Sequence, residues 1–287
     1  MIKIPKIKSP LRYPGGKSRA LKQILPIIPE FKEFREPMVG GGSVFFAVKQ
    51  IHPDKKYYIN DVNEELFLFF KYCKEDLSGL ILEIERIKEE YKVGKELYQK
   101  VLNDKDKLNE LQRAARFFIL NRITFSGLAE SGGYSDGAFK GRFTESSIKR
   151  LKEASKVLQN TKITNEDYEK SITEEGENVF IFLDPPYLSK TKSKLYGEKG
   201  KLHEGFNHER FAEIMKKCKH KWLVTYDDSP EIKALFNKPE DKDKIFIYEW
   251  ELQYGMNNFK QKTAAKGKEL FILNYEIPSL AQRRYLK

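Results

Sequence analysis

The chain has 287 residues, of which 40% are hydrophobic and 33% are charged, and this length is enough for one large α/β domain or for a core domain with an insertion. It has no run of the roughly 18 apolar residues that a membrane span needs and no secretory signal at its start, so we expect no membrane association and a cytoplasmic location. Neither its two cysteines nor its four histidines show metal-ligand spacing, and we expect no metal site. The net charge of +11 favours a polyanionic partner, although a solvated basic surface gives the same excess.

Near the N-terminus, the segment Arg12–Ser18 imitates the end of a phosphate-binding P-loop. That motif needs a glycine where this chain has Leu11, and it follows a β-strand, so the sequence disfavours an NTPase. An aromatic residue and a lysine that flank two glycines fit a different task, which is to clasp the adenine and the carboxylate of a small cofactor. The residues concerned are Tyr13, Gly15, Gly16 and Lys17.

A predicted strand over Phe34–Met38 leads into the glycine-rich turn 40–42, which precedes another apolar run. Glycines allow a tight turn and a close approach to a ligand, and a helix N-terminus offers free N–H groups. Asp61 follows the next predicted strand, 21 residues after Gly40, which is the spacing of an acidic residue that binds ribose hydroxyls. Phe45 replaces the third glycine of a dinucleotide fingerprint, which favours a single-nucleoside cofactor; a plain surface turn is the alternative.

Between residues 62 and 150 the pattern becomes helical. Helical spacing covers Glu64–Lys74, Leu77–Tyr91 and Leu108–Asn121, and a Gly/Ser-rich segment follows over 125–143. We interpret this region as an insertion between the second and third strands of the core. The predicted division of the chain is the first part of a catalytic core over 1–62, an inserted target-recognition domain over 63–150, and the second part of the core over 151–287.

Short apolar runs return after the insertion. Runs that end in polar or glycine residues are typical of buried strands with functional loops at their carboxyl ends, where open α/β sheets bind ligands. With the earlier candidate Lys56–Ile59, the predicted strands are Lys162–Thr164, Val179–Leu183, Lys221–Tyr226, Ile245–Leu252 and Glu269–Tyr275.

The strongest motif is the tetrapeptide Asp184-Pro185-Pro186-Tyr187, directly after a five-residue apolar run. Two prolines fix the backbone and remove two donors, so that nearby carbonyls stay free to accept hydrogen bonds. A carboxylate and a carbonyl together can accept both hydrogens of an exocyclic amine, and an aromatic face can stack on a planar base. Such a pair would expose the nitrogen lone pair to an electrophilic methyl group. A rigid turn without chemistry is the alternative.

In this order the motifs resemble the DNA adenine methylase family, the adenine-N6 DNA methyltransferases of the alpha-type motif order. In that family the cofactor motifs precede the target-recognition insertion and the catalytic tetrapeptide. The resembling pieces are Arg12–Lys17, Glu36–Phe46, Asn60, Asp61, Glu166–Tyr168, Asp184–Tyr187, Phe206–His208, Asn257, Asn258 and Glu269.

The resemblance implies a Rossmann-like methyltransferase core with a mixed seven-stranded sheet and an inserted, mostly helical DNA-recognition domain. It also implies transfer of a methyl group from S-adenosylmethionine to N6 of an adenine flipped out of double-stranded DNA. The implied catalytic residues are Asp184, Pro185, Pro186 and Tyr187. The implied cofactor-binding residues are Tyr13, Gly15, Gly16, Lys17, Pro37, Gly40, Gly41, Gly42, Ser43, Asp61, Asp167 and Asp184, with Asp167 receiving the adenine amino group.

The insertion matches the family less closely, so that the recognition sequence stays open between GATC and another short site. Arginine can pair bidentately with guanine, but Arg122 and Arg142 could also cap helices or neutralise phosphate. The DNA-binding residues that we expect are Arg122, Ser126, Tyr134, Arg142, Asn257 and Asn258.

Two other functions compete with this interpretation. One is methylation of an amino or amide nitrogen of RNA or protein, and the other is DNA binding by an inactive homologue. As partners we expect double-stranded DNA and, in a restriction-modification system, a cognate restriction endonuclease. We expect a monomer, with a dimer as the alternative.

Overall fold

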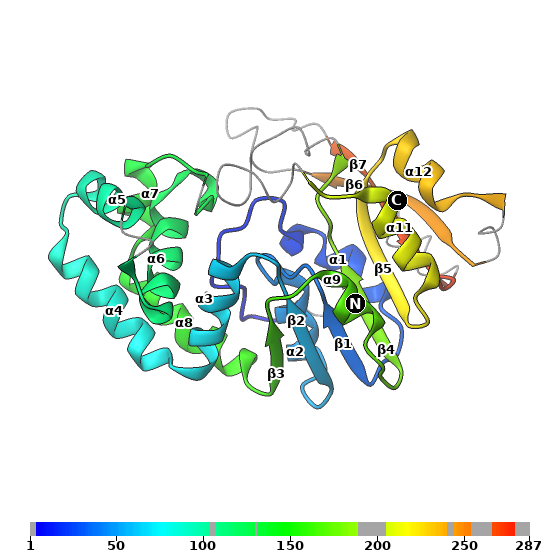
Figure 1. Ribbon diagram of the computed structural model, residues 1–287, viewed down its shortest axis with the longest axis horizontal. Helices are drawn as coiled ribbons and strands as arrows, with labels where there is room; N and C mark the ends of the chain where they lie inside the picture. Colours follow the sequence, from blue (N-terminus) through cyan, green and yellow to red (C-terminus); the bar gives the residue numbers. More distant parts are fainter. Residues whose placement is uncertain are drawn as a thin grey trace.

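The computed structural model describes residues 4–103, 107–129, 131–188, 205–239, 244–253 and 266–278. At its centre lies a seven-stranded sheet with the order β3-β2-β1-β4-β5-β7-β6 (Figure 1). The first five strands pair in parallel, whereas β7 runs antiparallel to both of its neighbours. The predicted α/β fold with a mixed seven-stranded sheet is therefore confirmed. The strands are β1 Glu33–Glu36, β2 Lys56–Asn60, β3 Thr161–Thr164, β4 Val179–Leu183, β5 Lys221–Asp227, β6 Phe246–Gln253 and β7 Lys266–Leu273.

Each strand lies where an apolar run was predicted, and the differences are at the ends. Strand β1 stops at Glu36 instead of Met38 because Pro37 has no N–H to donate to the ladder. Strand β7 begins at Lys266, three residues before its predicted start, because its partner β6 continues the pairing to that residue.

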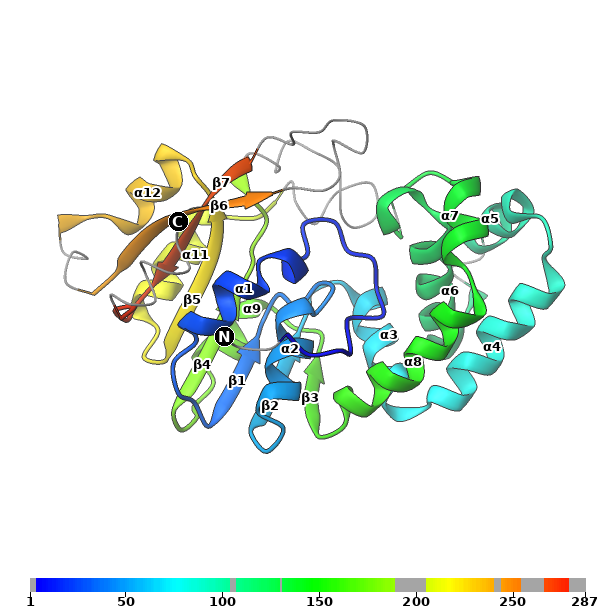
Figure 2. The same ribbon diagram turned by 180° about the vertical axis from the view of Figure 1, so that it is seen from behind.

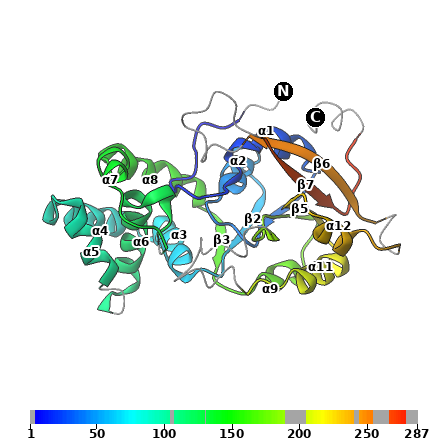
Figure 3. The ribbon, with the colours of Figure 1, turned by 90° about the horizontal axis from the view of Figure 1, so that it is seen from above.

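Strand β4 shows how the two faces of the sheet are buried. Phe180 and Phe182 belong to one hydrophobic cluster, whereas Ile181 and Leu183 belong to another. Successive side chains of a strand point to opposite faces, so a continuously apolar strand needs a cover on both sides. Figure 3 shows these covers, with α1 and α2 on one face and α9, α11 and α12 on the other.

The helices between β2 and β3 form the part of the molecule that was predicted as an insertion. They gather beside the β3 edge of the sheet (Figures 1 and 2). Three of them, α5, α7 and α8, were not among the predicted helices. The α-helices are α1 Leu21–Ile24, α2 Ser43–Ile51, α3 Glu64–Glu75, α4 Leu77–Glu90, α5 Gly94–Asn103, α6 Glu110–Ile123, α7 Asp136–Arg142, α8 Glu145–Leu158, α9 Tyr168–Thr173, α11 His208–Lys217 and α12 Pro230–Phe236.

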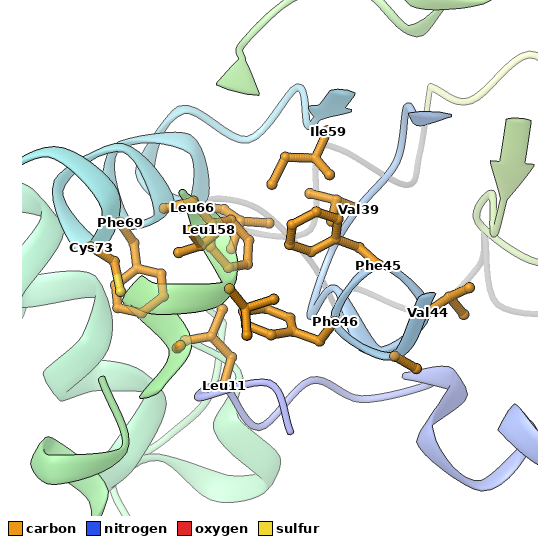
Figure 4. Close-up of a cluster of buried hydrophobic side chains, with 14 of the residues drawn as sticks. Leu11, Val39, Val44, Phe45, Phe46, Ile59, Leu66, Phe69, Cys73 and Leu158 are labelled. Carbon is orange, nitrogen blue, oxygen red and sulfur yellow. The ribbon is translucent and has the colours of Figure 1, made fainter. Parts of the chain in front are cut away.

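One hydrophobic cluster runs from the sheet into these helices without a break. Figure 4 shows Phe46 of α2, Phe69 of α3 and Leu158 of α8 packed together with Leu11 from the N-terminal segment. Such contacts tie the helices of the insertion firmly to the part of the core around β1, β2 and α2, because dense apolar packing leaves little room for relative motion. Among the described residues, no helix is long and apolar enough to cross a membrane.

Candidate active site

A cavity of about 390 Å³ opens at the carboxyl ends of β1, β2 and β4. Its walls come from the N-terminal segment, the glycine-rich loop, the ends of β2 and β4 and the start of α11. Of the predicted catalytic and cofactor residues, the cavity is lined by Tyr13, Gly15, Gly16, Lys17, Pro37, Gly40, Gly41, Gly42, Ser43, Asp61, Asp167, Asp184, Pro185, Pro186 and Tyr187. The fold therefore brings together residues that are up to 174 positions apart, from Tyr13 to Tyr187.

The carboxylate of Asp184 receives hydrogen bonds from two sides. Lys17 Nζ donates to Asp184 Oδ2 at 2.7 Å and also lies 2.6 Å from Oδ1. Thr225 Oγ1 donates to Oδ1 at 2.7 Å. Lys17 also donates to the carbonyl of Gly15 at 3.1 Å. Lys17 was predicted to bind the cofactor, and this stays a prediction; in the structure its ammonium group pairs with the carboxylate of Asp184, which was predicted to be catalytic. Thr225, in β5, was not predicted, since a threonine inside an apolar strand carries no sequence signal.

Tyr187 is held on several sides. Its hydroxyl donates to Oε2 of Glu269 in β7 at 2.9 Å, and Lys17 Nζ lies 4.8 Å from the centre of its ring. The ring of Tyr226 packs against it at 6.3 Å between centroids. The side chain of Tyr187 is therefore held in place between the cavity and the hydrophobic cluster that contains Ile181 and Leu183.

The glycine-rich loop connects β1 to α2. Gly42 caps α2 with φ of 68°, and Gly40 has φ of 46°, so both positions need the freedom of glycine. A Cβ atom on Gly41 would lie 2.6 Å from Cβ of Tyr13, and one on Gly40 would lie 2.8 Å from its ring. The side chain of Tyr13 thus lies close against this loop, and the close approach of a ligand stays a prediction.

Asn60, the last residue of β2, ties three loops together. Its side-chain amide donates to the carbonyls of Pro37 and Glu166 at 2.9 and 3.0 Å, and it accepts from the Glu166 N–H at 2.9 Å. Because Asn60 is buried, these bonds satisfy its polar atoms and fix the loops after β1 and β3 around Asp61.

Two carboxyl groups of the cavity have raised pKa values. Asp61 accepts from the N–H groups of Gly40 and Asn63 at 2.9 and 3.0 Å, but burial raises its pKa to about 6. Burial also raises the pKa of Glu36 well above its usual range, and the nearby Asp184 and Asp61 add to this shift. Glu36 accepts from the N–H of Phe45 at 2.7 Å and so anchors the first turn of α2.

Asp167 lies at the far end of the cavity, where it caps α9 through the N–H of Glu169 at 2.9 Å. Arg210 of α11 donates to both of its oxygens at 3.2 and 3.3 Å, and the same guanidinium lies over the ring of Tyr168. Arg210 also lines the cavity and was not predicted, because its partner is 43 residues away in sequence.

Four arginines converge where the insertion meets the N-terminal segment, and we call Arg12, Arg122, Arg142 and Arg150 the arginine cluster. Arg122 is only 4% exposed, and its Nε has no hydrogen-bond partner among the described residues. Burial, followed by the charges of the other three arginines, lowers the pKa of Arg122 to about 9.

The remaining predicted DNA contacts lie partly beside this cluster. Ser126 is in a tight turn with φ of 55°, next to the 61%-exposed Phe125. Tyr134 pairs with Thr124 in an isolated bridge and donates to Asp136 at 3.1 Å. Asn257 and Asn258 lie outside the described residues.

In the part of the chain that the structure describes, no three acidic, histidine or cysteine side chains lie close enough to hold a metal ion.

Comparison with known proteins gives a consistent match. Residues 13–256 match the family described as D12 class N6 adenine-specific DNA methyltransferase. The chain is 35% identical over 210 residues to Type II methyltransferase M.MjaIII of Methanocaldococcus jannaschii, over 65% of this chain and 72% of that protein. It is 30% identical over 284 residues to Type II methyltransferase M1.LlaDCHI of Lactococcus lactis subsp. cremoris, over 92% and 94% of the two chains. It is also 29% identical over 242 residues to the DNA N-6-adenine-methyltransferase of Escherichia phage P1, over 80% of this chain and 31% of that protein.

Proposed function

Because this chain belongs to the D12 class N6 adenine-specific DNA methyltransferase family, we propose that its cavity binds S-adenosylmethionine and that the segment Asp184–Tyr187 holds the target adenine next to it. Adenine-specific methylation of DNA follows from family membership and disfavours RNA or protein as the substrate. The observation that carries the finer proposal is the network of Lys17, Asp184 and Thr225 in the wall of the cavity.

The cavity suits a nucleoside cofactor in size and chemistry. Its volume of about 390 Å³ lies within the range of roughly 300–1,000 Å³ that small-molecule sites occupy. A carboxylate offers about four lone-pair sites, so Asp61 can accept two ribose hydroxyls beyond its two backbone bonds. Asp167 can accept the adenine amino group while Arg210 holds it in place. Bound S-adenosylmethionine would supply an electrophilic methyl group.

Asp184 orients the target nitrogen in this proposal. The lone pair of an exocyclic adenine amine is delocalised into the ring, and two acceptors on its hydrogens favour the pyramidal form that exposes the lone pair. Asp184 Oδ2 and a carbonyl of the Pro185–Pro186 turn are suitable acceptors, because Thr225 engages the other oxygen and Oδ2, which accepts from Lys17 Nζ at 2.7 Å, has a second lone pair. Alignment of the nitrogen with the methyl group can contribute up to roughly 7–11 kcal/mol of the rate acceleration. The adenine must first leave the duplex, at a cost of a few kcal/mol.

The arginine cluster is the proposed contact with the DNA backbone. None of its four members forms an ion pair with a described carboxylate, and Arg122 is buried among like charges. A buried cation without an opposite charge is unfavourable, and a phosphate group would relieve it. We propose that Ser126, Tyr134 and Arg142, which follow Arg122 in the sequence, contact the same DNA duplex. Asn257 and Asn258 remain expected DNA contacts.

Further parts of the proposal concern the setting of the enzyme. Two of the relatives are named type II methyltransferases, so a cognate restriction endonuclease is an expected partner. We propose that the enzyme acts as a monomer on double-stranded DNA in the cytoplasm, at GATC or another short site.

The test is to incubate the purified chain with labelled S-adenosylmethionine and duplex DNA, RNA or protein, and then to map modified bases by single-molecule sequencing. We expect label in DNA at adenine N6, in one sequence context. Asp184→Ala should abolish it, whereas Asp54→Ala, a change at an exposed turn before β2, should not. Equal labelling by the wild type and Asp184→Ala, or label only in RNA or protein, would refute the proposal.

A further inference from the structure

Glu269 is a fully buried glutamate of the sheet. It lies in β7 and pairs in register with Asp227 of β5 and Trp250 of β6, with 0% of its surface exposed. A buried carboxylate is unfavourable unless hydrogen bonds compensate for the loss of water. Here the hydroxyl of Tyr187 donates to its Oε2 at 2.9 Å.

The antiparallel direction of β7 is what brings Glu269 to Tyr187. Asp227 is the last residue of β5, so its partner Glu269 lies at the same edge of the sheet as Asp184. Because β7 runs antiparallel to β5, its first half, which includes Glu269, lies beside the carboxyl end of β5. The bond joins residues that are 82 positions apart, from the turn after β4 to the strand beyond β5.

The other contacts of Tyr187 hold the plane of the ring. The hydroxyl bond fixes the far end of the ring but still permits rotation about the ring axis. The ammonium group of Lys17 at 4.8 Å and the tilted ring of Tyr226 at 6.3 Å restrict that rotation. Tyr226 is itself held, since its hydroxyl lies 2.9 Å from Nδ1 of His208. Position and plane of the Tyr187 ring are thus determined by separate groups.

We propose that Glu269 is a positioning residue for the target adenine, acting through the hydroxyl of Tyr187. By anchoring that hydroxyl it keeps the aromatic ring where the extruded base stacks, with Asp184 at the base's amino group. This inference rests on the proposed function of Asp184–Tyr187. It assigns a task to a carboxylate that is not among the described residues lining the cavity.

A double-mutant cycle tests the proposal. Glu269→Leu removes the acceptor, Glu269→Gln keeps an uncharged one, and Tyr187→Phe removes the donor while keeping the ring. We expect kcat on DNA to fall about tenfold or more in Glu269→Leu and only a few-fold in Glu269→Gln, because the amide oxygen of glutamine can still accept from the Tyr187 hydroxyl. The affinity for S-adenosylmethionine should stay within about threefold of the wild type. In the Tyr187→Phe background, Glu269→Leu should have no further effect on kcat.

Base stacking is measured separately, with 2-aminopurine in place of the target adenine. Quenching by the Tyr187 ring should shorten its fluorescence lifetime in the wild-type complex, and Glu269→Leu should lengthen it. Glu65→Gln is the matched control, since Glu65 is 2% exposed but pairs with Arg113 and Arg116 in the insertion. It should lower the melting temperature and leave the lifetime unchanged.

The outcomes separate this inference from the proposed function. An Asp184→Ala variant with full activity would refute the proposed function and the inference with it. An inactive Asp184→Ala together with a Glu269→Leu variant of wild-type kcat and lifetime would overturn the inference alone, as would an equal loss from Glu269→Leu in both backgrounds. If Glu269→Leu does not fold, the same cycle with Glu269→Gln decides, because its few-fold loss must also vanish in Tyr187→Phe.

Discussion

Replacement of Thr225 by valine removes a single oxygen from the network around Asp184 and keeps the shape of the side chain. Thr225 is 0% exposed, and its Oγ1 donates to Asp184 Oδ1 at 2.7 Å. Lys17 remains paired with the same carboxylate in the variant, so that Asp184 keeps a partner but loses one of its two constraints. The variant therefore isolates the contribution of orientation from that of charge.

The size of the effect follows from the type of bond. Hydrogen bonds to charged groups contribute about 1.5–3 kcal/mol. We expect the lower part of this range, about 1.5–2 kcal/mol, because the Asp184 side chain is 22% exposed and water can replace the hydroxyl in part. If the bond acts mainly in the transition state, kcat falls by about 10- to 30-fold.

The assay is steady-state methylation of duplex DNA, with kcat and the KM for each substrate determined separately. Thr161→Val is the matched control, since Thr161 is 2% exposed and accepts from Lys49 Nζ at 2.6 Å in β3, away from Asp184. It should lower stability by about 1 kcal/mol without a change in kcat. A Thr225→Val enzyme with wild-type kcat, or one that loses no more activity than Thr161→Val, would refute the orienting role of Thr225.

Three further predictions concern the cofactor, the DNA and the ion pair. Because burial raises the pKa of Asp61 to about 6, this carboxylate binds a proton in the free protein below that pH. The proton must leave before S-adenosylmethionine binds, so the affinity measured by calorimetry should fall by up to about tenfold per pH unit below pH 6. Asp61→Asn should remove this dependence, and a flat profile in the wild type would contradict it. Arg122→Met should reduce the slope of log K for DNA against log salt by about 0.9, and an unchanged slope would speak against a phosphate contact. Lys17→Met should lower kcat by about tenfold or more while weakening cofactor binding less than threefold. A large loss of cofactor affinity with little change in kcat would instead indicate that Lys17 binds the cofactor carboxylate.

Much of the fold and the catalytic motif could be predicted from local patterns. The apolar run Val179–Leu183 predicts a buried strand, and Asp184 follows directly after it. Asp61 follows β2 in the same way. Because the carboxyl ends of parallel strands meet at one edge of a sheet, two such positions predict one site without knowledge of any contact. Glycines before α2 likewise predict a turn, since few other residues adopt a positive φ.

What only the tertiary structure decided is the choice of partners. Lys17 could serve a cofactor or a carboxylate, and the fold places it 2.6 Å from Asp184. Thr225 looks like an ordinary strand residue until β5, in its parallel place beside β4, brings it to Asp184. Glu269 resembles a family motif in the sequence, but only β7, in its antiparallel place beside β5, shows that its partner is Tyr187. Sequence periodicity shows which face of an element is buried, but a hydrogen bond across 82 residues depends on strand order and register. The motif was therefore visible in the chain, and the groups that hold it in place were visible only in the fold.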